Sequence, residues 1–324
     1  MTRAQPGSGR GTVLVTSRSF GSGDQDVQAE LEKAGLCVAR GPVDHDLTAL
    51  EEPLESAVAW IAGTGPVTAD HLAAGRRLRV VARYGVGVDA VDLDAARSRH
   101  IVVTNTPGAN SSSVADHALA LLLAVLRGVP AGDRQVRAGD WAVRRSHELG
   151  RLTVGIVGFG RIGQEVGRRL TGFGTRLLVH DPYIDRTIIE RAGAAELGLA
   201  EMAERCDLLT LHAPGGTTLV DRPWLESARR GMIVVNTARA DLVDESAAAD
   251  ALRTGILGGY AGDTLRSEGG GAGSPLLAPD LADRVVITPH LGAQTVEAVD
   301  RMGSMAVADV LAVLAGREPA HHVV

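Results

Sequence analysis

The sequence has few cysteines and no long apolar run, and each shortage excludes a class of protein. Only two cysteines occur among 324 residues, Cys37 and Cys206, so the sequence contains neither a disulfide framework nor a metal-binding cysteine pattern. We expect both thiols to be free and buried. No stretch reaches the roughly 20 consecutive apolar residues that a membrane-spanning helix needs. A disulfide-stabilised, zinc-binding or membrane-spanning protein is therefore not indicated.

Basic clusters are also missing. The formal net charge is −6, from 33 basic and 39 acidic residues, and Lys and Arg form no block. This balance gives no electrostatic reason to bind nucleic acid. Residues 1–11 are polar and Gly-rich and lack the apolar core of a signal peptide, so we expect a disordered lead-in and a cytoplasmic location. With 45% hydrophobic residues, the chain is long enough for two domains, each with its own core.

Short apolar runs alternate with helical segments along the chain, which predicts an α/β fold. Strands are expected at residues 12–16, 57–62, 80–83, 101–104, 154–157, 176–180 and 233–235. Strands that alternate with helices are typical of doubly wound parallel sheets. A long helix is expected over Val114–Arg127, with apolar residues around almost its whole circumference. Such a helix is buried on more than one side, as a core, interdomain or subunit-interface helix.

A glycine-rich turn with complete flanking context predicts a dinucleotide site. The strand at residues 154–157 runs into Gly158, Gly160 and Gly163, and a helix follows. The first glycine permits the tight turn, the second admits the pyrophosphate, and the third lets the helix pack on the strand. Free N–H groups at the start of the helix favour the phosphates.

Asp181 ends the next predicted strand, 18 residues after Gly163. At this position a carboxylate accepts hydrogen bonds from the ribose hydroxyls, and its charge repels a 2′-phosphate. The sequence therefore predicts NAD rather than NADP as the cofactor.

Three polar side chains follow predicted strands or lie in loops further along. Arg239 lies just past the strand at residues 233–235, Glu268 is in a Gly-rich loop, and His290 follows another apolar run. An arginine can hold a carboxylate and polarise the adjacent carbonyl, and a histidine can transfer a proton to its oxygen. A glutamate bonded to the imidazole raises its pKa. Together they suggest a site that reduces a carbonyl group.

A second glycine pair occurs in the N-terminal half, in Tyr84-Gly85-Val86-Gly87-Val88-Asp89. It lacks the surroundings of a nucleotide motif. Its bare backbone N–H groups are suited to a carboxylate, although a plain turn is the alternative.

Several motifs, in order, resemble the D-isomer-specific 2-hydroxyacid dehydrogenases, and the match extends over nearly the whole chain after about residue 55. The motifs are Tyr84-Gly85-Val86-Gly87-Val88-Asp89, Ser113-Val114-Ala115-Asp116-His117-Ala118-Leu119, Val235-Asn236-Thr237-Ala238-Arg239, and Thr288-Pro289-His290-Leu291-Gly292-Ala293-Gln294-Thr295. The resemblance implies that Arg239 binds the substrate carboxylate and carbonyl, that His290 is the acid/base, and that Glu268 pairs with His290.

The same resemblance assigns the remaining site residues, with no metal. Those expected to bind the cofactor are Gly158, Phe159, Gly160, Arg161, Ile162, Gly163, Asp181, His212, Ala213, Pro214, Thr237, Ala238, Asp263 and Gly292. Asp263 matches the aspartate that contacts the nicotinamide carboxamide. Those expected to bind the substrate are Arg83, Val86, Gly87 and Asn110.

The family fold implies two Rossmann-like, doubly wound domains, with the cofactor domain inserted in the substrate domain. The substrate domain is expected at residues 1–106 and 292–324 and the NAD-binding domain at 107–291. The active site is expected in the cleft between them. Family members are commonly homodimers with the long helix at the interface.

The run Asn110-Ser111-Ser112-Ser113-Val114-Ala115-Asp116 resembles the phosphoglycerate dehydrogenase branch, although we do not expect that branch's regulatory domain in this protein. That branch carries an Arg-Ser pair where this chain has Ala62 and Gly63, which argues against 3-phosphoglycerate as substrate. An alternative is a doubly anionic phosphonate or dicarboxylate substrate held by Arg83. Other side chains that could help to hold the second anionic group are Ser111, Ser112 and Arg144.

A second alternative is not an enzyme. NAD(H)-sensing transcriptional corepressors share this fold and also keep the Arg, Glu and His. A protein that binds NADH but converts no substrate would fit that class. The main expectation is an NAD-dependent enzyme that interconverts a 2-oxo acid and a D-2-hydroxy acid.

Overall fold

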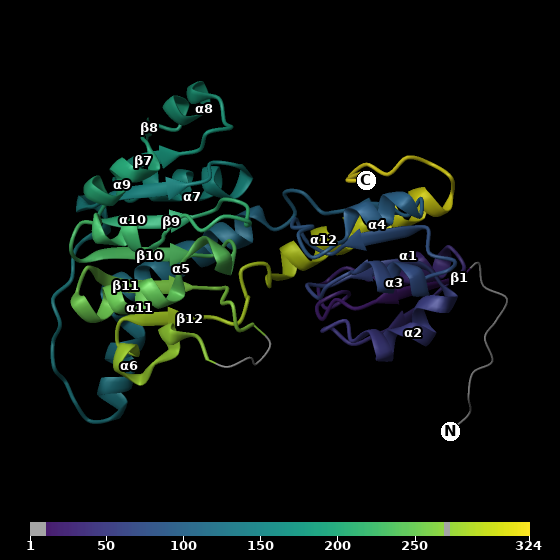
Figure 1. The fold of residues 1–324 in the computed structure, drawn as a ribbon, viewed down its shortest axis with the longest axis horizontal. Helices are drawn as coiled ribbons and strands as arrows, with labels where there is room; N and C mark the ends of the chain where they lie inside the picture. Colours follow the sequence, from purple (N-terminus) through teal and green to yellow (C-terminus); the bar gives the residue numbers. More distant parts are fainter. Residues whose placement is uncertain (1–10, 269–272) are drawn as a thin grey trace. The chain divides into compact units, whose positions relative to one another are not determined.

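The computed structural model describes residues 11–268 and 273–324, and it divides the chain into two compact units (Figure 1). The first unit contains the chain up to Asn110 together with Ala293–Val324, and the second is Ser111–Gly292. The predicted lead-in, apart from Gly11 in the first strand, and residues 269–272 of the Gly-rich loop lie outside the described residues.

In the first unit, the described residues form a parallel sheet of five strands in the order β2-β1-β3-β4-β5. The strands are β1 (Gly11–Val15), β2 (Leu36–Arg40), β3 (Ala57–Ala62), β4 (Val80–Arg83) and β5 (Val102–Thr104). The helices are α1 (Val27–Lys33), α2 (Leu47–Ser56), α3 (Ala69–Ala74), α4 (Leu93–Ser98) and α12 (Val296–Leu314). Apolar side chains of α1 and α12 cover one face, and those of α2, α3 and α4 cover the other.

A buried polar network lies where β1 and β3 end in this unit. The hydroxyl of Thr16 lies 2.6 Å from Nε2 of His45 and accepts a hydrogen bond from Nε1 of Trp60 at 2.9 Å. Nδ1 of His45 lies 3.0 Å from the carbonyl oxygen of Pro66, and Nε2 of His71 lies 2.8 Å from the carbonyl oxygen of His45. Burial lowers the pKa of His45 from 6.5 to about 4, so the ring is neutral near pH 7.

In the second unit, the described residues form a parallel sheet of seven strands in the order β12-β11-β10-β9-β6-β7-β8. The strands are β6 (Thr153–Val157), β7 (Arg176–His180), β8 (Ala195–Glu196), β9 (Leu208–Leu211), β10 (Met232–Asn236), β11 (Leu257–Gly262) and β12 (Val285–Ile287). The helices are α5 (Ser111–Arg127), α6 (Val129–Arg137), α7 (Arg161–Thr171), α8 (Arg186–Arg191), α9 (Leu199–Arg205), α10 (Arg222–Glu226) and α11 (Glu245–Thr254). Short 3₁₀ turns are at Leu149–Arg151, Ala240–Leu242, Pro275–Leu277 and Pro279–Leu281.

The strand order of the second unit reverses between β6 and β9. From β6 the chain adds β7 and β8 on one side, then crosses to β9 and continues to β12 on the other side. Loops at the carboxyl ends of strands on either side of such a reversal diverge, which opens a ligand-binding crevice in open α/β sheets. The turn that begins at Gly158 directly follows β6 and is therefore at this position.

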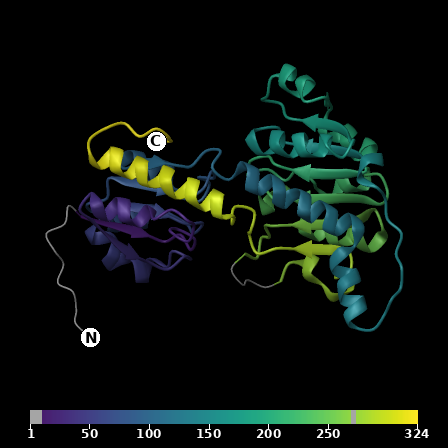
Figure 2. The ribbon, with the colours of Figure 1, turned by 180° about the vertical axis from the view of Figure 1, so that it is seen from behind.

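Helix α5 lies across one face of the seven-stranded sheet (Figure 2). It contacts α7, β10, β11 and β12, and its buried side chains include Leu119, Leu122 and Leu126. Leu123 and Val125 are only half-buried. The contacts with α7 and with the sheet confirm the prediction that the helix is buried on more than one side, and it begins at Ser111, three residues before the predicted start.

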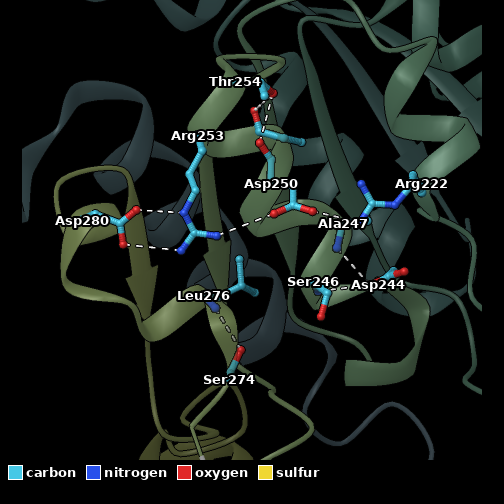
Figure 3. A network of polar contacts seen from close by, with 11 residues as sticks. Arg222, Asp244, Ser246, Ala247, Asp250, Arg253, Thr254, Ser274, Leu276 and Asp280 are labelled. Carbon is cyan, nitrogen blue, oxygen red and sulfur yellow. Dashed lines mark hydrogen bonds and ion pairs between the residues drawn. The ribbon is translucent and has the colours of Figure 1, made fainter.

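A surface network of ion pairs connects α10, α11 and the turn at Pro279–Leu281 (Figure 3). Arg253 contacts Asp280 at 2.9 Å, and Arg222 contacts Asp250 at 2.9 Å. These side chains are all well exposed, so solvent screens the pairs and each stabilises the fold little.

The two cysteines differ from the expectation. Cys206 is buried, and burial raises the pKa of its thiol to about 12. Cys37 is exposed, so the prediction that both are buried is wrong for this residue. Cys37 lies on the edge strand β2, where only part of the strand is covered by helices.

In the described ranges, no single helix is long and apolar enough to cross a membrane, and one bent pair, α5 with α6 at 57°, meets the length and composition requirements together. No cluster of three or more His, Cys, Asp or Glu side chains suited to a metal ion occurs among the same residues.

Candidate active site

The turn after β6 has the geometry that a dinucleotide requires. Gly158 has a φ of +86°, and a Cβ there would lie 2.6 Å from the backbone nitrogen of Ala213. A Cβ at Gly163 would overlap the carbonyl oxygen of Gly158, so only glycine allows α7 to approach this closely. A Cβ at Gly160 would meet nothing described within 4 Å. The open backbone at the start of α7 therefore fits a pyrophosphate group.

Asp181 follows β7 and contacts this turn. One carboxylate oxygen accepts a hydrogen bond from the backbone N–H of Phe159 at 2.7 Å, and the other accepts from the N–H of Tyr183 at 2.9 Å. Each carboxylate oxygen can accept more than one hydrogen bond, so both keep capacity for ribose hydroxyls. The sequence pattern located Asp181, but it did not reveal that its side chain also fixes the glycine turn.

The segment after β9 completes the nucleotide-binding region. The backbone N–H of His212 donates to the carbonyl of Val157 at 2.7 Å, which holds this segment beside the end of β6. Nε2 of His212 lies 2.9 Å from the hydroxyl of Thr210, and burial lowers the pKa of the imidazole to about 3. The imidazole of His212 is therefore neutral near pH 7. The backbone bond of His212 to Val157 places the following residues, Ala213 and Pro214, next to the glycine turn.

Arg239 lies in a turn that the side chain of Asn236 shapes. The amide of Asn236, buried at the end of β10, donates to the carbonyl of Arg239 at 2.7 Å and accepts from the N–H of Ala238 at 3.0 Å. Thr237 and Ala238 are thereby held between Asn236 and Arg239, which are joined by a hydrogen bond. Arg239 is half-buried, and its guanidinium donates to the carbonyl of Ala238 at 2.9 Å.

The predicted contact between His290 and Glu268 is present in the structure. Nδ1 of His290 lies 3.0 Å from Oε2 of Glu268, and the two side chains are 43% and 44% exposed. The hydrogen bond and negative charge of Glu268 raise the pKa of His290, against a smaller lowering by desolvation. His290 has a φ of +55°, a left-handed conformation that is uncommon for residues other than glycine.

Asp263 is buried at the end of β11, and its carboxylate binds the segment that follows His290. It accepts from the N–H groups of Leu291 at 2.8 Å and Gly292 at 2.7 Å. Burial alone would raise the pKa of this carboxyl, but the hydrogen bonds from these groups, His117 and Thr288 hold it below its ordinary value. Sequence reasoning assigned Asp263 to the nicotinamide and missed its role in the loop, because its partners are distant in sequence.

The first unit holds the other residues expected to bind substrate, apart from Arg239. Val86 is exposed and Gly87 half-buried in the loop after β4, and the carbonyl of Val86 accepts from the amide of Asn105 at 2.8 Å. Arg83 is buried beneath this loop, where its guanidinium donates to the carbonyl of Tyr84 at 2.7 Å. In the described part of the chain, Oδ1 of Asn110 is buried without a hydrogen-bond partner.

Arg144, which the sequence left open as a second cation at the site, is located elsewhere. It forms an ion pair with Asp283 at 2.6 Å, before the start of β12. His290 follows the carboxyl end of β12, whereas the partner of Arg144 precedes its amino end. Arg144 and His290 therefore lie at opposite ends of this strand. The hydroxyl of Ser112 accepts a hydrogen bond from Arg169 at 2.7 Å and so helps fix α5 to α7.

Comparisons with known proteins agree with this arrangement. The family described as "D-isomer specific 2-hydroxyacid dehydrogenase, NAD binding domain" matches residues 119–292. A D-3-phosphoglycerate dehydrogenase of Mycobacterium tuberculosis is 42% identical over 257 residues, which are 77% of this chain and 48% of the relative. A D-3-phosphoglycerate dehydrogenase of Methanocaldococcus jannaschii is 34% identical, over 90% of this chain and 56% of the relative. The chain thus spans about half the length of these curated relatives.

Solved structures extend the likeness to nearly the whole chain. The TT0316 protein from Thermus thermophilus is 37% identical, with a TM-score of 0.87 over 97% of this chain and 100% of the other. The D-lactate dehydrogenase from Aquifex aeolicus, complexed with NAD and lactic acid, is 25% identical, with a TM-score of 0.83 over 94% of this chain and 96% of the other. With the glycine turn and the His290–Glu268 pair, these matches show that the chain belongs to the D-isomer specific 2-hydroxyacid dehydrogenase family, close to its phosphoglycerate dehydrogenase branch.

Proposed function

We propose that this protein is an NAD-dependent oxidoreductase that interconverts a 2-oxo acid and a D-2-hydroxy acid. The observation that carries the proposal is the 3.0 Å contact between His290 and Glu268, formed in the unit that also holds the glycine turn and Arg239. A histidine with a raised pKa and an exposed ring can transfer a proton near neutral pH.

The cofactor would be held by the turn from Gly158 to Gly163 and by Asp181. The backbone at Gly160 and the start of α7 would bind the pyrophosphate, and the carboxylate of Asp181 would bind the ribose. When bound, the nicotinamide supplies or accepts the hydride. The negative charge of Asp181 would disfavour the 2′-phosphate of NADP.

Arg239 would bind the acid group of the substrate. Its guanidinium can donate two parallel hydrogen bonds to a carboxylate and polarise the neighbouring carbonyl. This charge-assisted contact would select a 2-oxo acid over a simple ketone, because a ketone lacks the negative charge that Arg239 would bind.

His290 would be the acid in reduction and the base in oxidation. Because Nδ1 contacts Glu268, Nε2 is the nitrogen left for the substrate. In reduction Nε2–H gives its proton to the carbonyl oxygen, and in oxidation Nε2 takes the hydroxyl proton. Glu268 would stabilise the charged imidazolium and hold the ring in one orientation.

The relatives named D-3-phosphoglycerate dehydrogenase suggest a substrate, but the first unit does not favour it. Ala62 is fully buried at the end of β3. A Cβ at Gly63 would lie 2.6 Å from the carbonyl oxygen of Thr16, so the backbone as folded admits no side chain there. Since that branch carries an Arg-Ser pair at these positions, we propose a 2-oxo acid other than the phosphorylated one.

A doubly anionic substrate is the second candidate, and Arg83 is its basis. This arginine lies at the end of β4, directly before the loop of Val86 and Gly87, and is the buried cation nearest in sequence to it. A phosphonate or second carboxylate could use its charge if the loop moves.

We further propose a cytoplasmic homodimer. Large apolar side chains are exposed in and after α6, including Trp141 at 78% and Val143 at 91%. A second copy of the chain that covers them would remove this apolar surface from water. Sedimentation of the wild-type protein and of a Trp141→Ser variant tests this, and a wild-type monomer at micromolar concentration would refute it.

The enzymatic proposal is tested by NADH oxidation with a panel of 2-oxo acids. The panel includes glyoxylate, hydroxypyruvate, branched and aromatic acids, 3-phosphohydroxypyruvate, and phosphonate-bearing and dicarboxylate analogues. Arg239→Ala should abolish turnover, whereas Arg253→Ala, which removes an exposed arginine of the surface network, should leave it unchanged (Figure 3). Tight NADH binding with no turnover on any acid would instead favour an NAD(H)-sensing binding protein.

A further inference from the structure

His117 connects helix α5 to the loop that carries His290. Its Nε2 lies 2.9 Å from the hydroxyl of Thr288 and 3.2 Å from a carboxylate oxygen of Asp263, and its side chain is 18% exposed. His117 is 146 positions from Asp263 and 171 positions from Thr288 in the chain, so only the fold brings it to them.

Asp263 is the central member of this group. Its carboxylate accepts hydrogen bonds from the hydroxyl of Thr288 and from the backbone of Leu291 and Gly292, and its own carbonyl accepts from the N–H of His290 at 3.1 Å. The chain is therefore bound to Asp263 on both sides of His290. Because the carboxylate is 2% exposed, water does not replace these bonds when one is lost.

The left-handed backbone of His290 requires such support. A residue other than glycine in this conformation costs on the order of 1–3 kcal/mol and persists only when its surroundings hold it. At His290 the backbone N–H donates to the carbonyls of Asp263 and Thr288, and the next two N–H groups donate to the Asp263 carboxylate. In this conformation Nδ1 reaches Glu268.

We propose that His117 is a positioning residue for the His290–Glu268 pair. Its Nε2–H donates to Thr288 and Asp263, which fixes the Asp263 carboxylate in the orientation that binds the backbone after His290. Loss of this donor frees the carboxylate to rotate, and the His290 backbone relaxes away from the left-handed conformation. The distance between His290 and Glu268 then increases. The inference rests on the proposed function only in naming His290 as the acid/base.

The test follows the imidazole of His290 by NMR titration of the full-length protein. The variants are His117→Ala, which removes the donor, and His117→Gln, which places an N–H donor at a similar distance from the backbone. Ala120→Ser, at an exposed position of α5, is the control. The charged groups near His290, which are Glu268, Asp263 and Arg239, are unchanged in all three variants.

In the wild type, the control and His117→Gln, His290 should titrate above its ordinary pKa, because the contact with Glu268 is kept. In His117→Ala the pKa of His290 should fall. In kinetic assays the same variant should lose kcat by about 10²-fold, the scale of a roughly 1 Å misplacement, while KM for the 2-oxo acid changes little. Recovery by His117→Gln assigns the effect to the donor rather than to the volume of the ring.

An unchanged His290 titration in His117→Ala would overturn the proposal, even if thermal stability fell, because His117 would then serve the fold alone. Equal shifts in the Ala and Gln variants would also overturn it. Should His117→Ala not fold, Thr288→Val removes the hydroxyl with little change of shape and should shift the titration in the same direction. If the wild-type protein converts no 2-oxo acid, the proposed function is refuted instead. The NMR titration of His290 would still test whether His117 positions the His290–Glu268 pair.

Discussion

Nδ1 of His290 lies 3.0 Å from Oε2 of Glu268, although the two residues are 22 positions apart and follow different strands. Glu268 lies beyond β11 and His290 directly beyond β12, which are parallel neighbours in the sheet. Parallel pairing places the carboxyl ends of both strands at one edge of the sheet, and His290 meets Glu268 there. The central mechanistic prediction follows from this contact.

Replacement of His290 by alanine should remove general acid catalysis. We expect kcat for 2-oxo acid reduction to fall by ~10²–10⁴-fold, with the Kd for NADH little changed. His100→Ala is a suitable control, because His100 is exposed and has the same left-handed φ of 55° but belongs to the first unit. Steady-state kinetics and NADH fluorescence titration separate the two effects. Turnover that survives in His290→Ala would contradict the assignment.

Replacement of Glu268 by glutamine should shift the pH profile. Reduction requires protonated His290, so kcat/KM is constant below the pKa of His290 and falls as pH rises through it. Glu268 raises this pKa and extends the active range to higher pH. Without the negative charge, the pKa drops and the decline begins at a lower pH, measured over pH 5 to 9. A decline at the same pH in both proteins would show that Glu268 does not act on His290.

Replacement of Asp181 should affect both cofactor choice and the glycine turn. Asp181→Ala removes the ribose acceptor and the partner of the Phe159 N–H, so NADH binding should weaken on the order of tenfold or more. Asp181→Asn keeps an oxygen for the backbone but loses the charge, so it should mainly reduce the discrimination against NADPH. Fluorescence titration with both cofactors measures this. A wild-type preference for NADPH would show that the interpretation of Asp181 is wrong.

Acid should destabilise the first unit through His45. The folded pKa is lowered to about 4, whereas the unfolded chain binds a proton near 6.5. The stability from the neutral ring is complete above pH 6.5 and is lost as pH falls toward 4, because the unfolded state then binds the extra proton. Denaturant unfolding between pH 7 and 4 should therefore show a smaller pH dependence in His45→Gln than in wild type. His100→Gln, at an exposed position, should keep the wild-type slope.

Local patterns were sufficient to predict several elements. The run before Gly158 forms β6, and the run that ends at His180 forms β7, as the alternation of apolar segments indicates. These predictions succeed because strand, glycine turn and helix are consecutive in sequence, and their apolar residues face cores on both sides of a parallel sheet. Gly163 is required by its close approach to Gly158 within the same short segment, whereas the backbone that Gly158 approaches is that of Ala213, which is distant in sequence.

Long-range contacts could not be predicted in this way. The bond between His117 and Asp263 depends on how α5 packs against β11 and β12, and no local pattern encodes it. The pairing of Arg144 with Asp283, 139 positions away, likewise removes a cation that the sequence left available. The exposure of Cys37 depends on β2 being an edge strand, and strand order is set by tertiary packing.

The most direct test of the account is chiral analysis of the product formed from the best 2-oxo acid and NADH. Wild-type protein should form the D-2-hydroxy acid in amounts equal to the NADH consumed, and His290→Ala should form almost none in the same time. Formation of the L enantiomer, or NADH binding without any hydroxy acid, would contradict the assigned reaction.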